Sequence, residues 1–295
     1  MNQQQFEAWE PRCAGHALSP RENDLTRFGL YVIGDEILSG RRTDRHLTHV
    51  IEALRSRDLA LTWAQFLPDE REPLEKAFRA SLATDDVVFS CGGIGATPDD
   101  HTRQAAGAAI DAPLELHPQA RDLIAAAVAK RGIHDLSTPE GKRVLMMGEF
   151  PRGAALIPNA YNGIPGFSIA RHYFVPGFPV MAWPMIDWVL DTEFREHHHR
   201  RPQLERSLLL FDTPESSIVP LMQDIESRFD GVRTFSLPSV GDGADGKPRR
   251  RHIEFGVKGA PAQVPAAYEY LQSQLQSMGC EVQSPAAPAS RPAAE

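Results

Sequence analysis

Short runs of β-branched and aromatic residues alternate with helical stretches between Arg27 and Asp191, and this alternation constrains the fold more than any other feature of the sequence. The expected strands are FGLYVI from Phe28, which exits through Gly34-Asp35-Glu36, then Leu59–Phe66, Asp86–Ser90, Ala154–Ile157 and His172–Val175. The expected helices are Thr43–Arg57, Glu70–Ala83, Pro118–Arg131 and one that starts near Phe178. Such alternation is typical of βαβ units, so it predicts an α/β fold around a largely parallel sheet.

A second, smaller domain is expected after the charged segment EFREHHHRRPQ. Beyond it the order is strand SLLLF, helix Glu215–Phe229, strands VRTFSL and HIEFGV, and helix Val264–Met278. This β-α-β-β-α order suits a split-βαβ, α+β domain. The predicted organisation is a flexible arm at 1–24, the α/β domain at 25–195, the small domain at 196–283 and a disordered Pro/Ala-rich tail at 284–295.

The charge and the cysteine content exclude several classes of protein. The 295 residues include 31 Lys+Arg and 39 Asp+Glu, and the net charge of −8 argues against a nucleic-acid binder. Three scattered cysteines outside any CxxC pair indicate reduced thiols and a cytoplasmic protein. The sequence has no apolar run long enough for a membrane span, and its N-terminus does not resemble a secretory signal, so no membrane association is expected.

The loops that leave the first and third predicted strands are where a ligand is expected, because ligands of open α/β sheets collect at the carboxyl ends of parallel strands. One loop is GDEILSG, from Gly34 to Gly40, and the other is SCGGIGATPDDHT, from Ser90 to Thr102. The glycines of the second loop permit backbone amides to approach a phosphate closely. We therefore expect the amides of residues 92–95 to be free and to face aspartates. The spacing matches neither a P-loop nor a dinucleotide fingerprint.

Two features of these loops have alternative interpretations. The segment Thr97–Asp100 is either part of the ligand site or a capping box that starts the next helix. Five acids on the two loops are typical of a Mg²⁺ site beside a phosphate, although loop acids are also commonly just solvated. These acids are Asp35, Glu36, Asp44, Asp99 and Asp100.

Four ordered motifs across residues 28–190 resemble the molybdopterin-binding-type domain of competence/damage-inducible protein A (CinA) and its relatives. The motifs are GDEILSG, SCGGIGATPDDHT, NAYNGIPGF from Asn159 and VPGFP from Val175. The resemblance implies a three-layer α/β/α domain with a mostly parallel sheet, followed by a KH-like domain. The sequence has no room for the C-terminal amidohydrolase domain of full-length CinA.

The resemblance also implies a site and two possible functions. The ligand-binding residues would be Gly34, Asp35, Glu36, Ser39, Gly92, Gly93, Gly95, Thr97, Thr102, Asn159, Gly163 and Gly166. A divalent metal such as Mg²⁺ would lie among Asp35, Asp44, Asp99 and Asp100, with Asp99 and Asp100 as the catalytic candidates. Departures from the usual motifs occur at Cys91, Ala96 and His46.

The function is therefore open between two alternatives. The first is a metal-dependent nucleotide pyrophosphatase that splits ADP-ribose to AMP and ribose 5-phosphate. The second is a non-catalytic protein of molybdenum cofactor metabolism that carries molybdopterin or another phosphorylated pterin or nucleotide. The family implies a homo-oligomer, a dimer or a trimer. RNA binding is not expected, because the GXXG candidate Gly243–Gly246 contains an acid.

Overall fold

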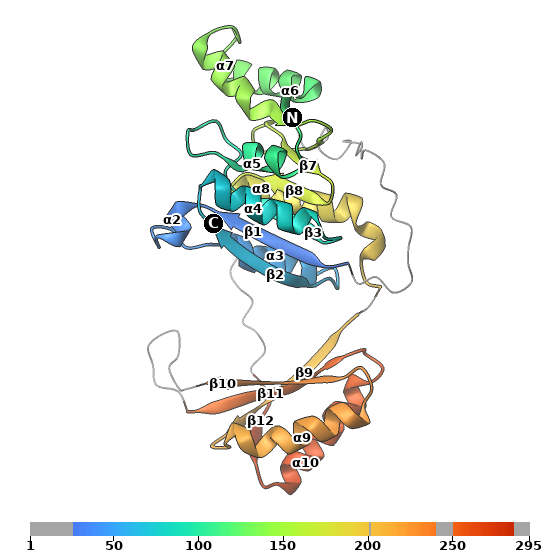
Figure 1. Cartoon of the computed structure of the whole chain (residues 1–295). Coiled ribbons are helices and arrows are strands. Elements are labelled where there is room, and N and C mark those ends of the chain that lie inside the picture. The colour runs from blue at the N-terminus through green and yellow to red at the C-terminus, as the bar shows by residue number, and fades with distance from the viewer. Residues whose placement is uncertain (1–25, 201, 240–249, 286–295) are drawn as a thin grey trace. The chain divides into compact units, whose positions relative to one another are not determined.

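A computed structural model describes residues 26–200, 202–239 and 250–285, and it divides the chain into two compact units between His198 and His199 (Figure 1). The two units are considered separately below. The predicted arm at 1–24, nearly all of the predicted tail and the GXXG candidate lie outside the described residues.

The first unit is built on a six-stranded sheet with the order β2-β1-β3-β8-β7-β6. The strands are β1 (Phe28–Ile33), β2 (Leu61–Leu67), β3 (Val87–Cys91), β6 (Ala155–Ile157), β7 (Gly166–Ile169) and β8 (His172–Val175). Strands β2, β1, β3 and β8 are parallel, and β7 is antiparallel to both of its neighbours. Strand β6 therefore runs in the same direction as β8. The expected α/β class with a mostly parallel sheet is confirmed.

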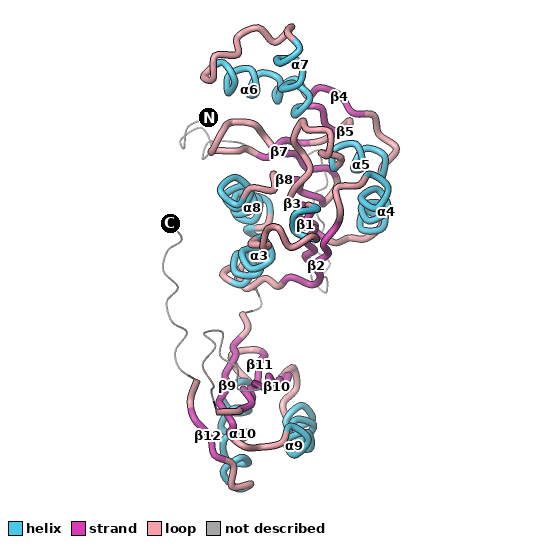
Figure 2. Tube along the Cα trace, turned by 90° about the vertical axis from the view of Figure 1, so that its left-hand side faces the viewer, coloured by secondary structure: helices cyan, strands magenta, loops and turns pink. Residues whose placement is uncertain are grey.

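Helices cover both faces of this sheet and complete the three layers (Figure 2). One face carries α3 (His46–Arg55) and α8 (Pro179–Glu193), and the other carries α4 (Arg71–Leu82) and α5 (Thr102–Ala109). Successive side chains of the central strands alternate between two buried clusters. Phe28 and Leu30 pack toward α3 and α8, whereas Tyr31 and Ile33 pack toward α4 and α5. This double burial explains why the central strands are largely apolar, with Ser90 and His172 as buried polar exceptions.

Smaller elements extend the first unit beyond the sheet. They are α2 (Asp35–Leu38), the hairpin of β4 (Leu114–Leu116) and β5 (Glu149–Pro151), α6 (Pro118–Ala129), α7 (Pro139–Leu145), η1 (Met146–Gly148) and η2 (Arg195–His197). Of these elements, only α6 had been expected. None of the helices in the described part of the chain combines the length and the apolar character that a membrane span requires.

The second unit is a four-stranded antiparallel sheet with two helices packed on it. The strands β9 (Leu204–Phe211), β10 (Arg233–Ser239), β11 (His252–Gly259) and β12 (Glu281–Gln283) have the order β10-β11-β9-β12. The helices are α9 (Glu215–Arg228) and α10 (Val264–Ser277). The expected β-α-β-β-α order is therefore present, and β12 adds an edge strand that the sequence pattern did not indicate.

Candidate functional site

All four sequence motifs converge on one edge of the six-stranded sheet, because β1, β3, β6 and β8 run in the same direction and each motif adjoins a carboxyl end. Gly34 follows β1, Gly92 follows β3 and Pro176-Gly177 follow β8. The Asn159 loop joins β6 to β7, which starts at this same edge. This edge is the candidate site, and it is where an open α/β sheet binds ligands.

The glycine-rich loop after β3 is a tight turn that passes between two other strand ends. Gly92 has φ 115° and Gly93 has φ 66°, a region in which glycine avoids the strain that other residues suffer. A Cβ atom on Gly92 would lie 2.3 Å from the carbonyl oxygen of Ile33, and one on Gly177 would lie 3.3 Å from Gly92 Cα. These glycines therefore permit the loops after β1, β3 and β8 to pack together.

Only part of the loop's backbone is available to a ligand. The Gly92 N–H donates to Val175 O at 3.0 Å, and the Gly95 N–H donates to Asp100 Oδ1 at 2.9 Å. The expectation that all amides of residues 92–95 are free is therefore wrong for these two glycines, whose donors close the loop onto β8 and onto itself. Among the described residues, the amides of Gly93 and Ile94 have no hydrogen-bond partner.

The Thr97–Asp100 segment folds as a turn of its own instead of starting a helix. The Asp100 carboxylate accepts the Thr97 N–H at 2.8 Å as well as the Thr97 hydroxyl, and the Asp100 N–H donates to Thr97 O at 3.0 Å. The next helix, α5, begins only at Thr102. The capping-box interpretation is therefore wrong as a helix start. The Asp100 carboxylate is hydrogen-bonded within the loop, whereas the Asp99 side chain is exposed.

The first two residues of α5 hold this loop in place through hydrogen bonds. The buried Thr102 hydroxyl donates to Gly92 O at 3.0 Å. Arg103 is only 1% exposed, and its guanidinium donates to Gly95 O at 2.6 Å, to Glu149 O at 3.3 Å and to Met146 O. Burial lowers the pKa of Arg103. The sequence analysis missed this buried cation, because its partners are carbonyl groups that no motif identifies.

The acids of the first loop meet a carboxylate that the sequence analysis also missed. Asp69 follows β2, and its Oδ2 accepts the Asp35 N–H at 2.9 Å, while the Asp69 N–H donates to Asp35 Oδ1 at 3.3 Å. Burial raises the pKa of Asp69, and the nearby carboxylates of Asp35, Glu36 and Asp99 add to this effect. The signal was available, because Asp69 leaves a parallel strand at the same edge as Asp35.

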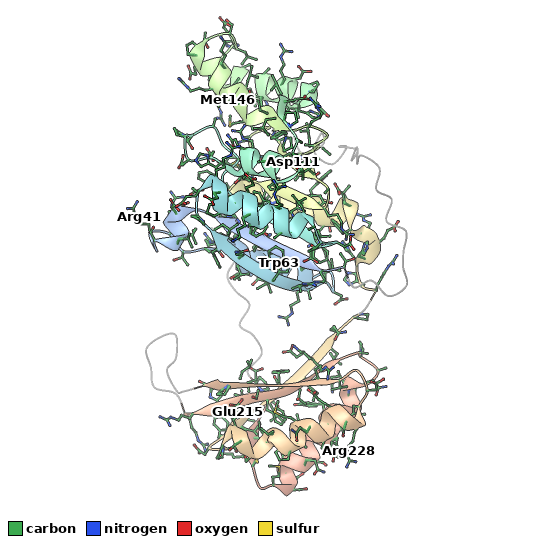
Figure 3. All side chains as sticks on the ribbon, in the orientation of Figure 1. Arg41, Trp63, Asp111, Met146, Glu215 and Arg228 are labelled. Atoms are coloured by element: carbon green, nitrogen blue, oxygen red, sulfur yellow. The ribbon has the colours of Figure 1, made fainter. Side chains whose placement is uncertain are left out.

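The remaining residues of this loop have backbone roles or are exposed. The Gly34 N–H donates to Leu67 O at 3.1 Å, and the exposed Ser39 donates its N–H to Asp35 O at 2.8 Å. Arg41 extends outward from the turn after α2, as Figure 3 shows. Arg41 and the adjacent exposed Arg42 thus bring positive charge beside the acids of this loop.

Asp44 differs from the other acids of this edge, because its carboxylate caps the N-terminus of α3. Its Oδ1 and Oδ2 accept the N–H groups of His46 and Leu47 at 2.8 and 3.0 Å. The buried His46 places Nε2 3.0 Å from Gly177 O, and burial lowers its pKa, so the neutral ring donates this bond. His46 therefore ties α3 to the loop that touches Gly92.

The thiol of Cys91 is not a nucleophile in this arrangement. Cys91 lies in the core beneath α3 and α8 and is 1% exposed. Burial raises its pKa, so the thiolate form is disfavoured.

The loop between β6 and β7 forms the other end of the edge. Asn159 is 1% exposed, its Oδ1 accepts the Tyr161 N–H at 3.1 Å, and its Nδ2 has no partner among the described residues. Gly163 has φ 78° and donates its N–H to Asn159 O at 3.0 Å. A Cβ on Gly166 would lie 2.4 Å from Phe174 O, so glycine is needed where β7 meets β8.

The arrangement offers two unpaired amides to an anion and a separate group of carboxylates to a cation. Within the described ranges, no group of three or more His, Cys, Asp or Glu side chains is arranged to hold a metal ion. Cavities of about 580 and about 230 Å³ lie elsewhere, the larger between α9 and β10 of the second unit and the smaller beside β4, β5 and the start of α6.

The fold and the site define an α/β/α ligand-binding domain with a glycine-rich loop at the carboxyl edge of its sheet. The profile of a family described as "probable molybdopterin binding domain" matches residues 29–196. Because this match covers more than half of the sequence, the chain belongs to that family.

Similar proteins carry the CinA name. A CinA-like protein of Anaeromyxobacter sp. (strain Fw109-5) is 31% identical over 208 residues, which is 68% of this chain and 49% of that protein. One from Citrifermentans bemidjiense is 30% identical over 201 residues, 67% of this chain and 47% of that protein. A solved structure of the protein CinA from Thermoplasma acidophilum has a TM-score of 0.49 at 22% identity and covers 56% of this chain and 98% of its own. This chain spans about half the length of the curated relatives it matches.

Proposed function

We propose that this protein binds a phosphorylated pterin of the molybdopterin type at the carboxyl edge of the first unit and carries it without hydrolysing it. The observation that carries the proposal is the pair of unpartnered amides at Gly93 and Ile94, in a left-handed turn where a phosphate can approach the backbone closely. The amide of Asn159, buried without a partner, supplies a second donor group at the same edge. The family membership supports a pterin as the ligand.

A phosphorylated nucleotide would use the same backbone contacts, because amides recognise the phosphate and not the group attached to it. Two of the aspartates predicted for the metal site, Asp100 and Asp44, support binding more than hydrolysis. Asp100 accepts three hydrogen bonds within its own loop, and Asp44 caps α3. Neither carboxylate is left with an oxygen free of a protein donor, so we assign both a role in holding the loops.

A second candidate function, the metal-dependent pyrophosphatase, is favoured by one observation. The Asp69 carboxylate accepts the Asp35 N–H at 2.9 Å, and burial together with the nearby carboxylates of Asp35, Glu36 and Asp99 raises its pKa. These acids would repel a pyrophosphate unless a cation lay between them. Mg²⁺ is commonly held by one or two carboxylates together with substrate phosphates, so this donor set suits a metal that arrives with the substrate. Asp35 and Asp69 would hold that ion, which would neutralise the pyrophosphate charge.

Gly93→Ala is expected to weaken the binding of 6-hydroxymethylpterin phosphate at least about tenfold, as measured by calorimetry. A Cβ at this position would lie 2.3 Å from Thr102 Oγ1, so the turn must shift and its amides no longer point at the phosphate. The loss of one hydrogen bond to a charged group costs roughly 1.5–3 kcal/mol of binding free energy. Gly132→Ala is the matched control, because Gly132 also has positive φ, 86°, but has nothing within 4 Å of its Cβ position.

The same experiment separates the two functions. A wild-type protein that binds neither the pterin phosphate nor ADP-ribose would refute the binding proposal. Prolonged incubation of wild-type protein with ADP-ribose and Mg²⁺, Mn²⁺ or Co²⁺ is expected to yield no AMP. AMP formation that is lost in Asp69→Asn would instead establish the pyrophosphatase.

A further inference from the structure

Two aromatic side chains stand exposed on the loops that surround the candidate site. Tyr161, between β6 and β7, is 64% exposed, and Phe178, between β8 and α8, is 55% exposed. Val180, in the first turn of α8, is also more than half exposed. Large apolar side chains gathered at one edge of a ligand-binding domain are unusual on a solvated surface and indicate a contact with a binding partner or ligand.

Phe178 is tied directly to the glycine-rich loop. It follows Gly177, whose Cβ position lies 3.3 Å from Gly92 Cα and whose carbonyl oxygen lies 3.0 Å from His46 Nε2. Backbone bonds then fix the start of α8, because the N–H groups of Met181 and Ala182 donate to Phe178 O at 2.9 and 2.8 Å. Phe178 therefore directly follows a glycine that packs against Gly92, the residue before the unpartnered Gly93 amide.

Tyr161 is connected to the start of α8 through the loop between β6 and β7. Its N–H donates to the buried Asn159 Oδ1 at 3.1 Å, which fixes the turn that carries the ring. The neighbouring Asn162 donates through Nδ2 to Met181 Sδ at 3.2 Å, and Met181 is bonded to Phe178. A chain of contacts therefore runs from Tyr161 through the start of α8 to the glycine-rich loop.

We propose that Tyr161 and Phe178 are specificity-determining residues that stack on the planar heterocycle of the ligand whose phosphate the amides of Gly93 and Ile94 hold. This inference rests on the proposed function. A ligand with an anionic end and a flat aromatic ring matches the two kinds of surface that the edge presents, amide donors at the β3 loop and aromatic faces at the neighbouring loops. A second copy of the chain would cover the same aromatics without needing the amides, and the experiment below distinguishes it.

Two probes separate stacking from phosphate binding, namely 6-hydroxymethylpterin phosphate and inorganic phosphate, each titrated by calorimetry into the full chain. Tyr161→Ala is expected to weaken pterin phosphate binding about tenfold and to leave the affinity for inorganic phosphate within about twofold. Phe178→Ala is expected to act in the same direction. Tyr161→Phe retains the ring and should keep wild-type affinity. Leu237→Ala, at a side chain 59% exposed in the second unit, is the control and should change neither affinity.

The outcomes distinguish this inference from the function on which it rests. If Gly93→Ala abolishes pterin phosphate binding while Tyr161→Ala and Phe178→Ala leave it unchanged, the aromatic residues do not stack on the ligand and only this inference is overturned. If the wild-type protein binds neither probe, the proposed function fails first. If Tyr161→Ala changes the sedimentation mass and weakens both probes equally, the aromatic residues form a subunit contact and the inference is overturned.

Discussion

Arg103→Met is expected to lower the free energy of unfolding of the first unit by about 3 kcal/mol, because it leaves the carbonyl groups of Gly95, Met146 and Glu149 in the interior without their donor. Methionine keeps the length and the apolar packing of the side chain, so the loss reports on the hydrogen bonds. Trp63, Trp183 and Trp188 lie in the first unit and no tryptophan follows His199, so tryptophan fluorescence during urea unfolding reports on the first unit.

The same substitution is expected to weaken ligand binding, since Gly95 belongs to the glycine-rich loop that Arg103 holds. Arg121→Met is the matched control, because the Arg121 side chain is 60% exposed and should change stability by less than about 0.5 kcal/mol. A stability of Arg103→Met equal to that of the wild type would show that the buried guanidinium does not hold the loop.

Acidification from pH 7 to pH 4 is expected to remove about 3 kcal/mol of stability through His172 alone. This ring is 1% exposed, its Nε2 lies 2.7 Å from Ser81 Oγ, and burial lowers its pKa from 6.5 to about 4. Between these two values the unfolded chain binds a proton that the folded chain does not, so stability falls as the pH falls. Each unit by which the folded and unfolded pKa values differ corresponds to roughly 1.4 kcal/mol of folding stability.

The variant that tests this expectation is His172→Gln, compared with wild type by urea unfolding across the same pH range. Other histidines and carboxylates titrate equally in both proteins, so the difference between the two curves isolates His172. The difference should shrink toward acidic pH as the wild-type penalty appears. His134→Gln, at an exposed histidine, should follow the wild-type curve. Parallel curves for His172→Gln and wild type would contradict the burial argument.

The fold was predictable from the sequence where elements are long or bounded by clear loops. The strand at His172–Val175 has the bounds expected from its aromatic and β-branched run, and α3, α4 and α8 begin within three residues of their expected starts. The β4–β5 hairpin was missed because its strands are three residues each, too short for a period to appear. Strand β7 was missed because its first residues belong to the NAYNGIPGF motif, where glycine and proline suggest a loop.

The site was predictable in position but not in detail. Parallel strands brought the loops with Asp35, Gly92 and Gly177 to one edge, as the alternation of strands and helices implies. Which amides remain free could not be predicted, because Gly92 and Gly95 bond to Val175 and Asp100 through contacts that depend on how the loop turns. Asp69 could have been found by applying the strand-exit rule to the edge strand as well.

Titration of the ¹⁵N-labelled protein with 6-hydroxymethylpterin phosphate, followed by amide chemical shifts, tests the central claim most directly. The largest shifts are predicted at the N–H groups of Gly93 and Ile94, which have no partner among the described residues, and much smaller ones at Gly92 and Gly95, which are already bonded. If residues 92–95 stay unshifted while amides elsewhere respond, the phosphate is held at another place and the assignment of this edge is wrong.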